Sequence, residues 1–430
     1  MSGTSKRFRA WEPGQAWLLP PSTADFVPPD HPAHFVREVV REQLDLGEVF
    51  AAYTKLQGQP PFHPTMMTAL LLFAYTQGVY SSRRIAKACE ERVDFMAVTG
   101  MQKPDFRTVN AFRKRHLPAL GRLFVQVLKL CRRAGLVRLG HVALDGSKFK
   151  ANASKHKAMS YPRMREEEAR LRAEVDEWFR EADQADGSED AAFGQDKRGD
   201  ELPSWVANKQ QRLERIREAK AALEQEAEDD EDKHDRGEGS GRAPKPLQER
   251  QRNFTDPDSR VMRTKQTFEQ NYNCQLAVDA DSQVIVAASL DNKQNDAPTL
   301  PAMVQQIKEN TGRQARELSA DTGYCSEANL VELARRHIAA YVATGRQAHC
   351  KAAATGQRQR GRAADMARRL LQGGYRSRYR LRKQTVEPVF GQIKEAMGFR
   401  RFLLRGLARV ADEWRLICVA HNLRKLVLAR

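Results

Sequence analysis

The chain has 430 residues, of which 72 are lysine or arginine and 55 are aspartate or glutamate, giving a net charge of +17. This charge favours a polyanionic partner such as nucleic acid, with a membrane surface as the weaker alternative. Because no apolar run could cross a bilayer, no secretory signal opens the chain and the six cysteines lack zinc-like spacing, we expect a soluble cytoplasmic protein of more than one domain, with reduced thiols.

The N-terminal part shows an arm followed by helical patterns. Residues 1–60 have no clear hydrophobic period, so we expect an extended lead-in there. Three helices are expected after it, the first beginning at Pro64 and the third following Pro104. Short helices of this kind over residues 61–138 fit a helix-turn-helix-like DNA reader, and they fit a helical bundle with solvated bases equally well. The bases of the third helix are Arg107, Arg113, Lys114 and Arg115.

The next elements are strands and helices in alternation. A short apolar strand is expected over 141–149, and a hairpin over 272–278 and 283–290. A helix, a strand ending at Asp321, a second helix, a second strand and a late helix across Glu387 follow in that order. This order of elements predicts an α/β domain, in which the strands around the second helix pair in parallel.

A different kind of sequence lies between the first strand and the hairpin. It is rich in arginine and glutamate and poor in β-branched residues, and residues 155–267 are therefore expected to form a helical insertion. The acidic, glycine-containing stretch 224–241 is expected to be flexible. Two long antiparallel helices are expected because apolar residues recur at helical spacing in two places, at Leu171, Val175 and Trp178 and at Leu213, Ile216 and Leu223.

Three acids on these elements are candidates for a metal site. Asp145 and Asp321 each follow an apolar strand, and Glu387 lies on a helix flanked by bases. Carboxylates that converge from different elements suit Mg²⁺, and two such ions about 4 Å apart can cleave a phosphodiester. Taken singly, an Asp before glycine is usually a turn former and a Glu beside lysine a solvated charge. Their joint placement at the ends of neighbouring elements favours the metal site.

Several segments, in chain order, carry a likeness to a known family. They read FHPTMMTALLLFAYTQGVYSSRRIAKACEE, KPDFRTVNAFRKRH, LDGSKFKANASKHKAMSY, YNCQLAVD, SADTGYCSEANL, VEPVFGQIK and FRRFLLRGL. On these segments the chain resembles the bacterial insertion-sequence DDE transposases with an RNase H-like core, and among them the insertion sequence 1182 group. The likeness extends over nearly the whole chain.

The resemblance implies a fold and an activity. The fold is an RNase H-like mixed sheet over 139–154 and 268–400 with flanking helices, the helical insertion, an N-terminal all-helical domain and a C-terminal helix over 401–430. The activity is cleavage of transposon ends and transfer of the freed 3′ hydroxyl to target DNA, with Mg²⁺ or Mn²⁺ as cofactor. The implied partner is double-stranded DNA, held by a homodimer at the nucleoid. The implied catalytic and metal-binding triad is Asp145, Asp321 and Glu387.

The family also has a Tyr, Arg, Glu and Lys signature around the third acid. It maps onto Tyr379, Arg382, Glu387 and Lys394. The interval from Arg382 to Glu387 is one residue longer than usual, and Lys383 stands where that spacing puts the base, so Glu387 and Lys394 match better than Arg382. We expect these bases to grip phosphates near the scissile bond, although a solvated basic face explains each arginine equally well.

Two other functions remain open from the sequence. A catalytically silent DNA-binding relative or regulator would keep the basic surfaces without cutting. A structural or interaction protein would use the long helices of residues 163–230 and would associate in high salt, whereas DNA binding through phosphates falls steeply as salt rises.

Overall fold

The computed structural model describes residues 23–54, 60–193, 204–236, 243–264, 267–293, 295–345, 361–373 and 377–430. The contacts divide the chain into two compact units, Met1–His116 and Leu117–Arg430, and each is described by itself. In the part that the structure describes, no helix is both long and apolar enough to span a membrane. The beginning of the expected N-terminal arm, residues 1–22, lies outside the described residues.

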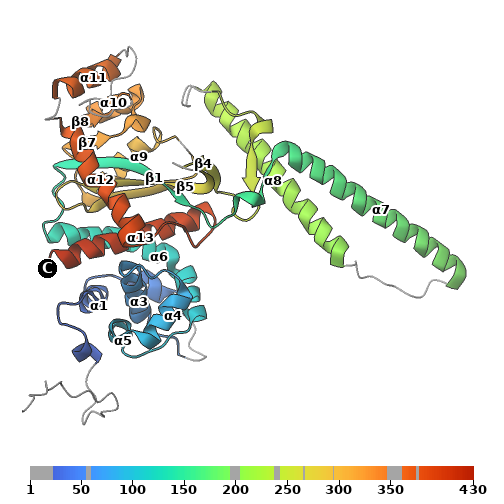
Figure 1. The fold of residues 1–430 in the computed structure, drawn as a ribbon, viewed down its shortest axis with the longest axis horizontal. Coiled ribbons are helices and arrows are strands. Elements are labelled where there is room, and N and C mark those ends of the chain that lie inside the picture. The colour runs from blue at the N-terminus through green and yellow to red at the C-terminus, as the bar shows by residue number, and fades with distance from the viewer. Residues whose placement is uncertain are drawn as a thin grey trace, which may run out of the picture. The chain divides into compact units, whose positions relative to one another are not determined.

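The first unit consists of helices (Figure 1). Helix α3 is buried along almost its whole length, which explains its continuous apolar sequence. The extended lead-in predicted over 1–60 is wrong for α1, which begins after the capping residue His31 and buries one face. This helix is short and follows a proline-rich segment, which hides its period. The helices are α1 (Pro32–Glu42), α2 (Gly47–Ala51), α3 (Pro64–Thr76), α4 (Ser82–Glu91), α5 (Val93–Thr99) and the start of α6 (Phe106–Arg133).

The second unit is built on a six-stranded mixed sheet. Strand β1 lies at its centre, with β5 antiparallel on one side and β7 and then β8 parallel on the other. Strands β4 and β6 both pair with β5 in antiparallel fashion. This is the predicted α/β mixed sheet, and the fold-class prediction is confirmed. The strands are β1 (His141–Lys150), β4 (Arg260–Arg263), β5 (Phe268–Asp279), β6 (Ile285–Asp291), β7 (Glu317–Ala320) and β8 (Ala339–Val342).

Helices cover this sheet and fix its centre. Helix α13 packs on β6, where Asn422 exchanges two hydrogen bonds of 2.9 Å with the backbone of Ile285. Helix α12 packs on β1, and Phe149 of β1 contacts the rings of Phe390 and Trp414. Burial of these aromatic side chains holds α12 in place beside the central strand. The helices are α9 (Thr299–Thr311), α10 (Glu327–Arg335), α11 (Gly361–Gly373), α12 (Leu381–Gly391) and α13 (Leu407–Leu428).

Two long helices, α7 (Tyr161–Phe193) and α8 (Ser204–Asp235), form the insertion between β1 and β5 (Figure 1). They are antiparallel, because Tyr161 at the start of α7 hydrogen-bonds Glu224 in the second half of α8, and Glu174 further along α7 pairs with Lys209 near the start of α8. At their base, β2 (Ala158–Ser160) pairs with β3 (Gln251–Asn253). Their shared core includes predicted apolar positions and consists of Met164, Leu171, Leu213, Ile216, Ala219 and Leu223.

The acidic stretch 224–241 differs from the prediction of a flexible segment. Helix α8 continues through it as far as Asp235, and residues 237–242 lie outside the described residues. The sequence predicted a solvated run of acids because their basic partners are distant in the sequence and cannot be identified from the run itself.

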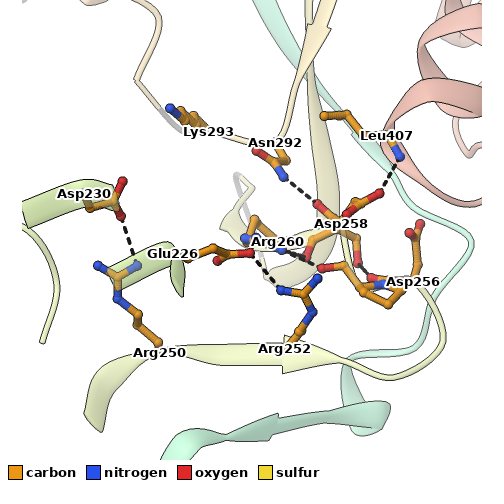
Figure 2. Close-up of polar contacts among 12 residues, drawn as sticks. Glu226, Asp230, Arg250, Arg252, Asp256, Asp258, Arg260, Asn292, Lys293 and Leu407 are labelled. Atoms are coloured by element: carbon orange, nitrogen blue, oxygen red, sulfur yellow. Dashed lines mark hydrogen bonds and ion pairs between the residues drawn. The ribbon is translucent and has the colours of Figure 1, made fainter. Parts of the chain in front are cut away.

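Those partners are arginines at the base of the insertion and on the sheet edge (Figure 2). Glu226 of α8 accepts hydrogen bonds of 2.8 Å from both Arg252 of β3 and Arg260 of β4. Asp230 accepts one of 3.0 Å from Arg250. These ion pairs join α8 to the sheet. They stabilise the acidic end of α8 and explain why the helix continues through it.

Candidate active site

The register of the central strands brings the first two acids together. In the parallel pair of β1 and β7, Leu144 lies opposite Ala320 at the end of the ladder. The next residue on each strand is an acid, Asp145 and Asp321. Asp321 follows the end of β7, but β1 does not end at Asp145 as expected: it continues to Lys150, still paired with β5. The two acids therefore lie side by side where the parallel ladder of β1 and β7 ends, and the ends of parallel strands form binding sites.

Asp321 is oriented by the turn that follows it. Its Oδ1 accepts a hydrogen bond of 2.9 Å from the backbone N–H of Gly323, so Asp321 caps the short helix Thr322–Tyr324. The hydroxyl of Thr322 donates to the carbonyl of Gly345, 2.8 Å away, beyond β8. The turn is thus tied to the neighbouring strand, and the carboxylate is held at the sheet edge.

One arginine links the first and third acids. Arg382 of α12 donates from Nη1 to Asp145 Oδ2 and from Nη2 to Glu387 Oε1, each over 2.8 Å. The side chains of Arg382 and Asp145 are 11% and 14% exposed, whereas that of Glu387 is 44% exposed. The structure thus brings Asp145, Asp321 and Glu387 to one region, with a cation already between two of them.

The electrostatics of the region show a surplus of negative charge. Burial raises the pKa of Asp145 to about 7; the charge of Arg382 lowers it, and the charges of Asp321 and Glu387 raise it. Burial also raises the pKa of Asp321, which Arg382 lowers and Asp296 and Glu387 raise. A single guanidinium does not neutralise this many carboxylates, so a further cation would stabilise their ionised forms.

The donor set suits a hard divalent ion such as Mg²⁺, since it consists of carboxylate oxygens from two strands and one helix. In the described residues, however, no three histidine, cysteine, aspartate or glutamate side chains are arranged so that they could share one metal ion. Between Asp145 and Glu387 lies the guanidinium of Arg382. An ion that bridges these two carboxylates would take the place of that guanidinium.

A fourth acid, Asp296, was missed by the sequence reasoning. It lies between β6 and α9, and its Oδ1 accepts hydrogen bonds from Asn273 Nδ2 at 2.7 Å and Gln275 Nε2 at 2.6 Å. Its charge acts on Asp321. The segment around it has no hydrophobic period, and the only available signal was an acid between the hairpin and the next helix.

The structure decides between the two bases of the signature. Spacing put Lys383 at the position of the base, but Lys383 is exposed, and Arg382 is the residue that contacts the acids. Successive residues of a helix point about 100° apart, so only one of them can face the sheet. Tyr379 is buried, with the Arg382 guanidinium 5.8 Å from its ring centre. Sequence spacing alone does not indicate which of the two bases faces the acids.

Lys394 is bound to the central strand. It lies in a π-helical turn, Gln392–Ala396, and its Nζ donates to Ser147 Oγ at 2.6 Å and to the carbonyl of Lys148 at 3.2 Å. The same ammonium lies 4.6 Å from the ring centre of Phe149. These contacts anchor the end of the Glu387 helix to the strand that carries the first acid.

The bases predicted on the third N-terminal helix fall into two groups. Arg113 is 4% exposed and donates to the carbonyl of Tyr80 at 2.7 Å, so its position does not fit the predicted phosphate contact. Arg113 lies on an apolar face of its helix, where a buried charge is costly unless it is hydrogen-bonded. The carbonyl of Tyr80 supplies such an acceptor. The exposed bases are Arg107, Lys114 and Arg115.

Comparison with known families gives two matches. Residues 21–115 match the family model described as Transposase domain (DUF772), and residues 244–423 match the one described as Transposase DDE domain. The second range includes Asp321 and Glu387 and leaves out Asp145, whose place beside them comes from the register of β1. No curated protein and no solved structure matches the chain.

Proposed function

We propose that the chain is a transposase of the DDE family, as its two matches to transposase domains indicate, and that it cuts DNA at the ends of a transposon and joins the freed 3′ hydroxyl to target DNA. The observation that carries the proposal is the pairing of β1 with β7, because Asp145 and Asp321 lie side by side where this ladder ends, beside Arg382 and Glu387. Within the family, the resemblance favours the insertion sequence 1182 group.

In this proposal Asp145, Asp321 and Glu387 are the catalytic residues and would hold Mg²⁺ or Mn²⁺. When bound, such ions supply activation of the attacking oxygen and stabilisation of the leaving oxygen. Arg382 holds Asp145 and Glu387 in position before the metal arrives, because its two N–H groups bind one oxygen of each. Lys394 keeps the helix of Glu387 in register with the strand of Asp145.

The proposed partner is double-stranded DNA, as terminal repeats and as target. Phosphates would contact exposed bases as point charges or guanidinium forks, and the net charge of +17 would attract the duplex. A homodimer that holds two transposon ends is proposed from the family resemblance. The exposed bases proposed for phosphate contact are Arg107, Lys114, Arg115 and Lys383.

A catalytically silent DNA-binding relative is the second candidate. One observation favours it: the ion pairs of Arg382 with Asp145 and Glu387 fill the place between two of the proposed ligands. Such a protein would bind the transposon ends and leave them intact in the presence of Mg²⁺ or Mn²⁺.

The test is cleavage of a labelled duplex that carries the terminal inverted repeat bordering the gene. We expect the wild type to nick at the repeat end in Mg²⁺, and Asp145→Ala, Asp321→Ala and Glu387→Ala to bind the duplex but cut at least about a thousandfold more slowly. The matched control is Glu395→Ala, which removes an exposed carboxylate near Glu387 and should cut normally. Binding without cutting by the wild type in both metals would instead support the silent relative.

A further inference from the structure

Each of the two acids beside the end of the β1–β7 ladder is followed closely by a glycine, Gly146 after Asp145 and Gly323 after Asp321. The usual reason for glycine in a turn is a positive φ, but neither residue is among the glycines with positive φ. Their backbone conformations are open to other residues. The reason for glycine at these two positions must therefore be space.

The space beside both glycines is filled by one carboxylate, that of Asp296. A Cβ on Gly146 would lie 3.1 Å from Asp296 Oδ1 and 2.7 Å from Gln275 Nε2. A Cβ on Gly323 would lie 3.1 Å from Asp296 Oδ2 and also 3.1 Å from Asp321 Oδ1. Asp296 thus approaches the backbone next to both proposed metal ligands, and Oδ2 of Asp296 and Oδ1 of Asp321 lie on the same side of the Gly323 backbone.

Buried amides fix the orientation of this carboxylate. Gln275 is fully buried, and its Oε1 accepts a hydrogen bond from the hydroxyl of Tyr324, so its amide nitrogen must face Asp296. Asn273 donates to the same oxygen, Oδ1. Among the described residues no hydrogen bond reaches Oδ2, which is the oxygen of Asp296 that lies beside Gly323, as Oδ1 of Asp321 does. One oxygen is therefore bound by the protein, and the other faces the site.

We propose that Asp296 is a fourth carboxylate of the catalytic centre, whose Oδ2 binds a divalent cation together with Oδ1 of Asp321. The proposal rests on the function proposed above and extends its metal site. The charge balance supports the proposal. Two divalent ions bring four positive charges, the triad supplies three negative charges, and Asp296 would supply the fourth. The donor is also of the right kind, since Mg²⁺ and Mn²⁺ take carboxylate oxygens.

The test is Mn²⁺ binding by the full-length chain without DNA, followed by electron paramagnetic resonance and calorimetry. We expect Asp296→Asn to weaken one Mn²⁺ site by about tenfold to a hundredfold. The matched control is Asp291→Asn, at the end of β6, whose carboxylate accepts from the backbone N–H groups of the next two residues and should leave Mn²⁺ binding unchanged. Wild-type affinity in Asp296→Asn would overturn the proposal.

Two further variants separate a ligand from a structural support. Asp296→Cys should bind Cd²⁺ more tightly than Asp296→Asn does, because a thiolate prefers the softer ion; equal affinities for Cd²⁺ contradict direct coordination. Gly323→Ala keeps all the acids and adds a methyl group beside the two oxygens, so it should also weaken Mn²⁺ binding. If Asp296→Asn does not fold, unchanged binding in Gly323→Ala rejects the proposal.

The same titrations distinguish this inference from the proposed function. If Asp321→Ala abolishes Mn²⁺ binding while Asp296→Asn retains it, Asp296 is no ligand and the triad stands. If Asp145→Ala, Asp321→Ala and Asp296→Asn all bind Mn²⁺ as the wild type does, the metal site itself is wrong.

Discussion

A single charge bridges two opposite charges in two regions of the second unit: Arg382 between Asp145 and Glu387, and Glu226 between Arg252 and Arg260. All four distances from nitrogen to oxygen are 2.8 Å, so distance does not distinguish the two bridges. Burial does, because the Arg382 side chain is 11% exposed and that of Glu226 is 36% exposed.

The surroundings of the two bridges differ as well. Around Arg382 the acids outnumber the bases, since the charges of Asp321 and Asp296 also act there, and burial raises the pKa of Asp145 to about 7. Around Glu226 the charges pair locally at the base of the insertion (Figure 2). Ion pairs with the same geometry can therefore have different roles. The Arg382 pairs lie at a site with an excess of acids, which would favour a further cation, whereas the Glu226 pairs connect α8 to the sheet.

The largest expected effect comes from removing the buried bridge. Arg382→Met leaves Asp145 facing Glu387 without a counterion, which should lower the free energy of unfolding at pH 8 by about 3 kcal/mol in the absence of metal. Mg²⁺ should restore part of this loss and should stabilise the variant more than the wild type. Urea unfolding with and without Mg²⁺ measures both effects.

The matched control for this bridge is Lys383→Met, which removes the neighbouring exposed base and should change stability by less than about 0.5 kcal/mol. Equal losses in Arg382→Met and Lys383→Met would mean that the bridge is no stronger than a surface charge, and the contrast between the two regions would disappear.

A somewhat smaller effect is expected from pH. Because the pKa of Asp145 is raised from 3.8 to about 7, the folded chain keeps a proton between these values that the unfolded chain has released. The stability contributed by this proton is fully present below pH 3.8 and is lost as the pH rises to about 7, with a total change of about 2 kcal/mol after solvent screening.

Chemical unfolding of the metal-free protein across this range tests the pH effect. The stability of Asp145→Asn should vary less with pH than that of the wild type, because an amide carries no titrating proton. Parallel pH profiles for the two proteins would show that Asp145 has an ordinary pKa and that the region lacks surplus negative charge.

The smallest effect is expected at the exposed bridge. Glu226→Gln should cost less than about 1 kcal/mol, and the loss should shrink further in high salt. Hydrogen exchange of the backbone amides in β3 and at the end of α8 should increase locally. The matched control is Glu228→Gln, an exposed acid of the same helix. A loss as large as that of Arg382→Met would refute the proposed difference between the two bridges.

The sequence predicted the elements that have a local period. The strand before Asp145, the hairpin, the alternating helices and strands after it and the two long helices all show apolar residues at regular spacing, and the structure contains them. The position of Asp145 and Asp321 after apolar runs was enough to predict that both acids face one site, although the continuation of β1 beyond Asp145 was not expected.

Features that depend on distant partners escaped the same reasoning. Asp296 lies in a segment without a period, and its role depends on the amides of Asn273 and Gln275 from another strand. The buried position of Arg113 depends on the carbonyl of Tyr80 on a different segment of its unit. Likewise, packing decides which side of α12 faces the sheet, and so whether Arg382 or Lys383 contacts the acids. The spacing of residues in the sequence does not give this side.

The position of the insertion has a consequence for folding. Strands β1 and β5 are hydrogen-bonded neighbours, with Lys150 opposite Asn271, although the whole of α7 and α8 lies between them in the sequence. Once α7 and α8 have paired and β2 has joined β3, the loop left to close is roughly one fifth as long, which lowers its entropic cost by about 1.4 kcal/mol. Pairing of the strand that carries Asp145 should therefore be faster in chains whose helical hairpin forms early.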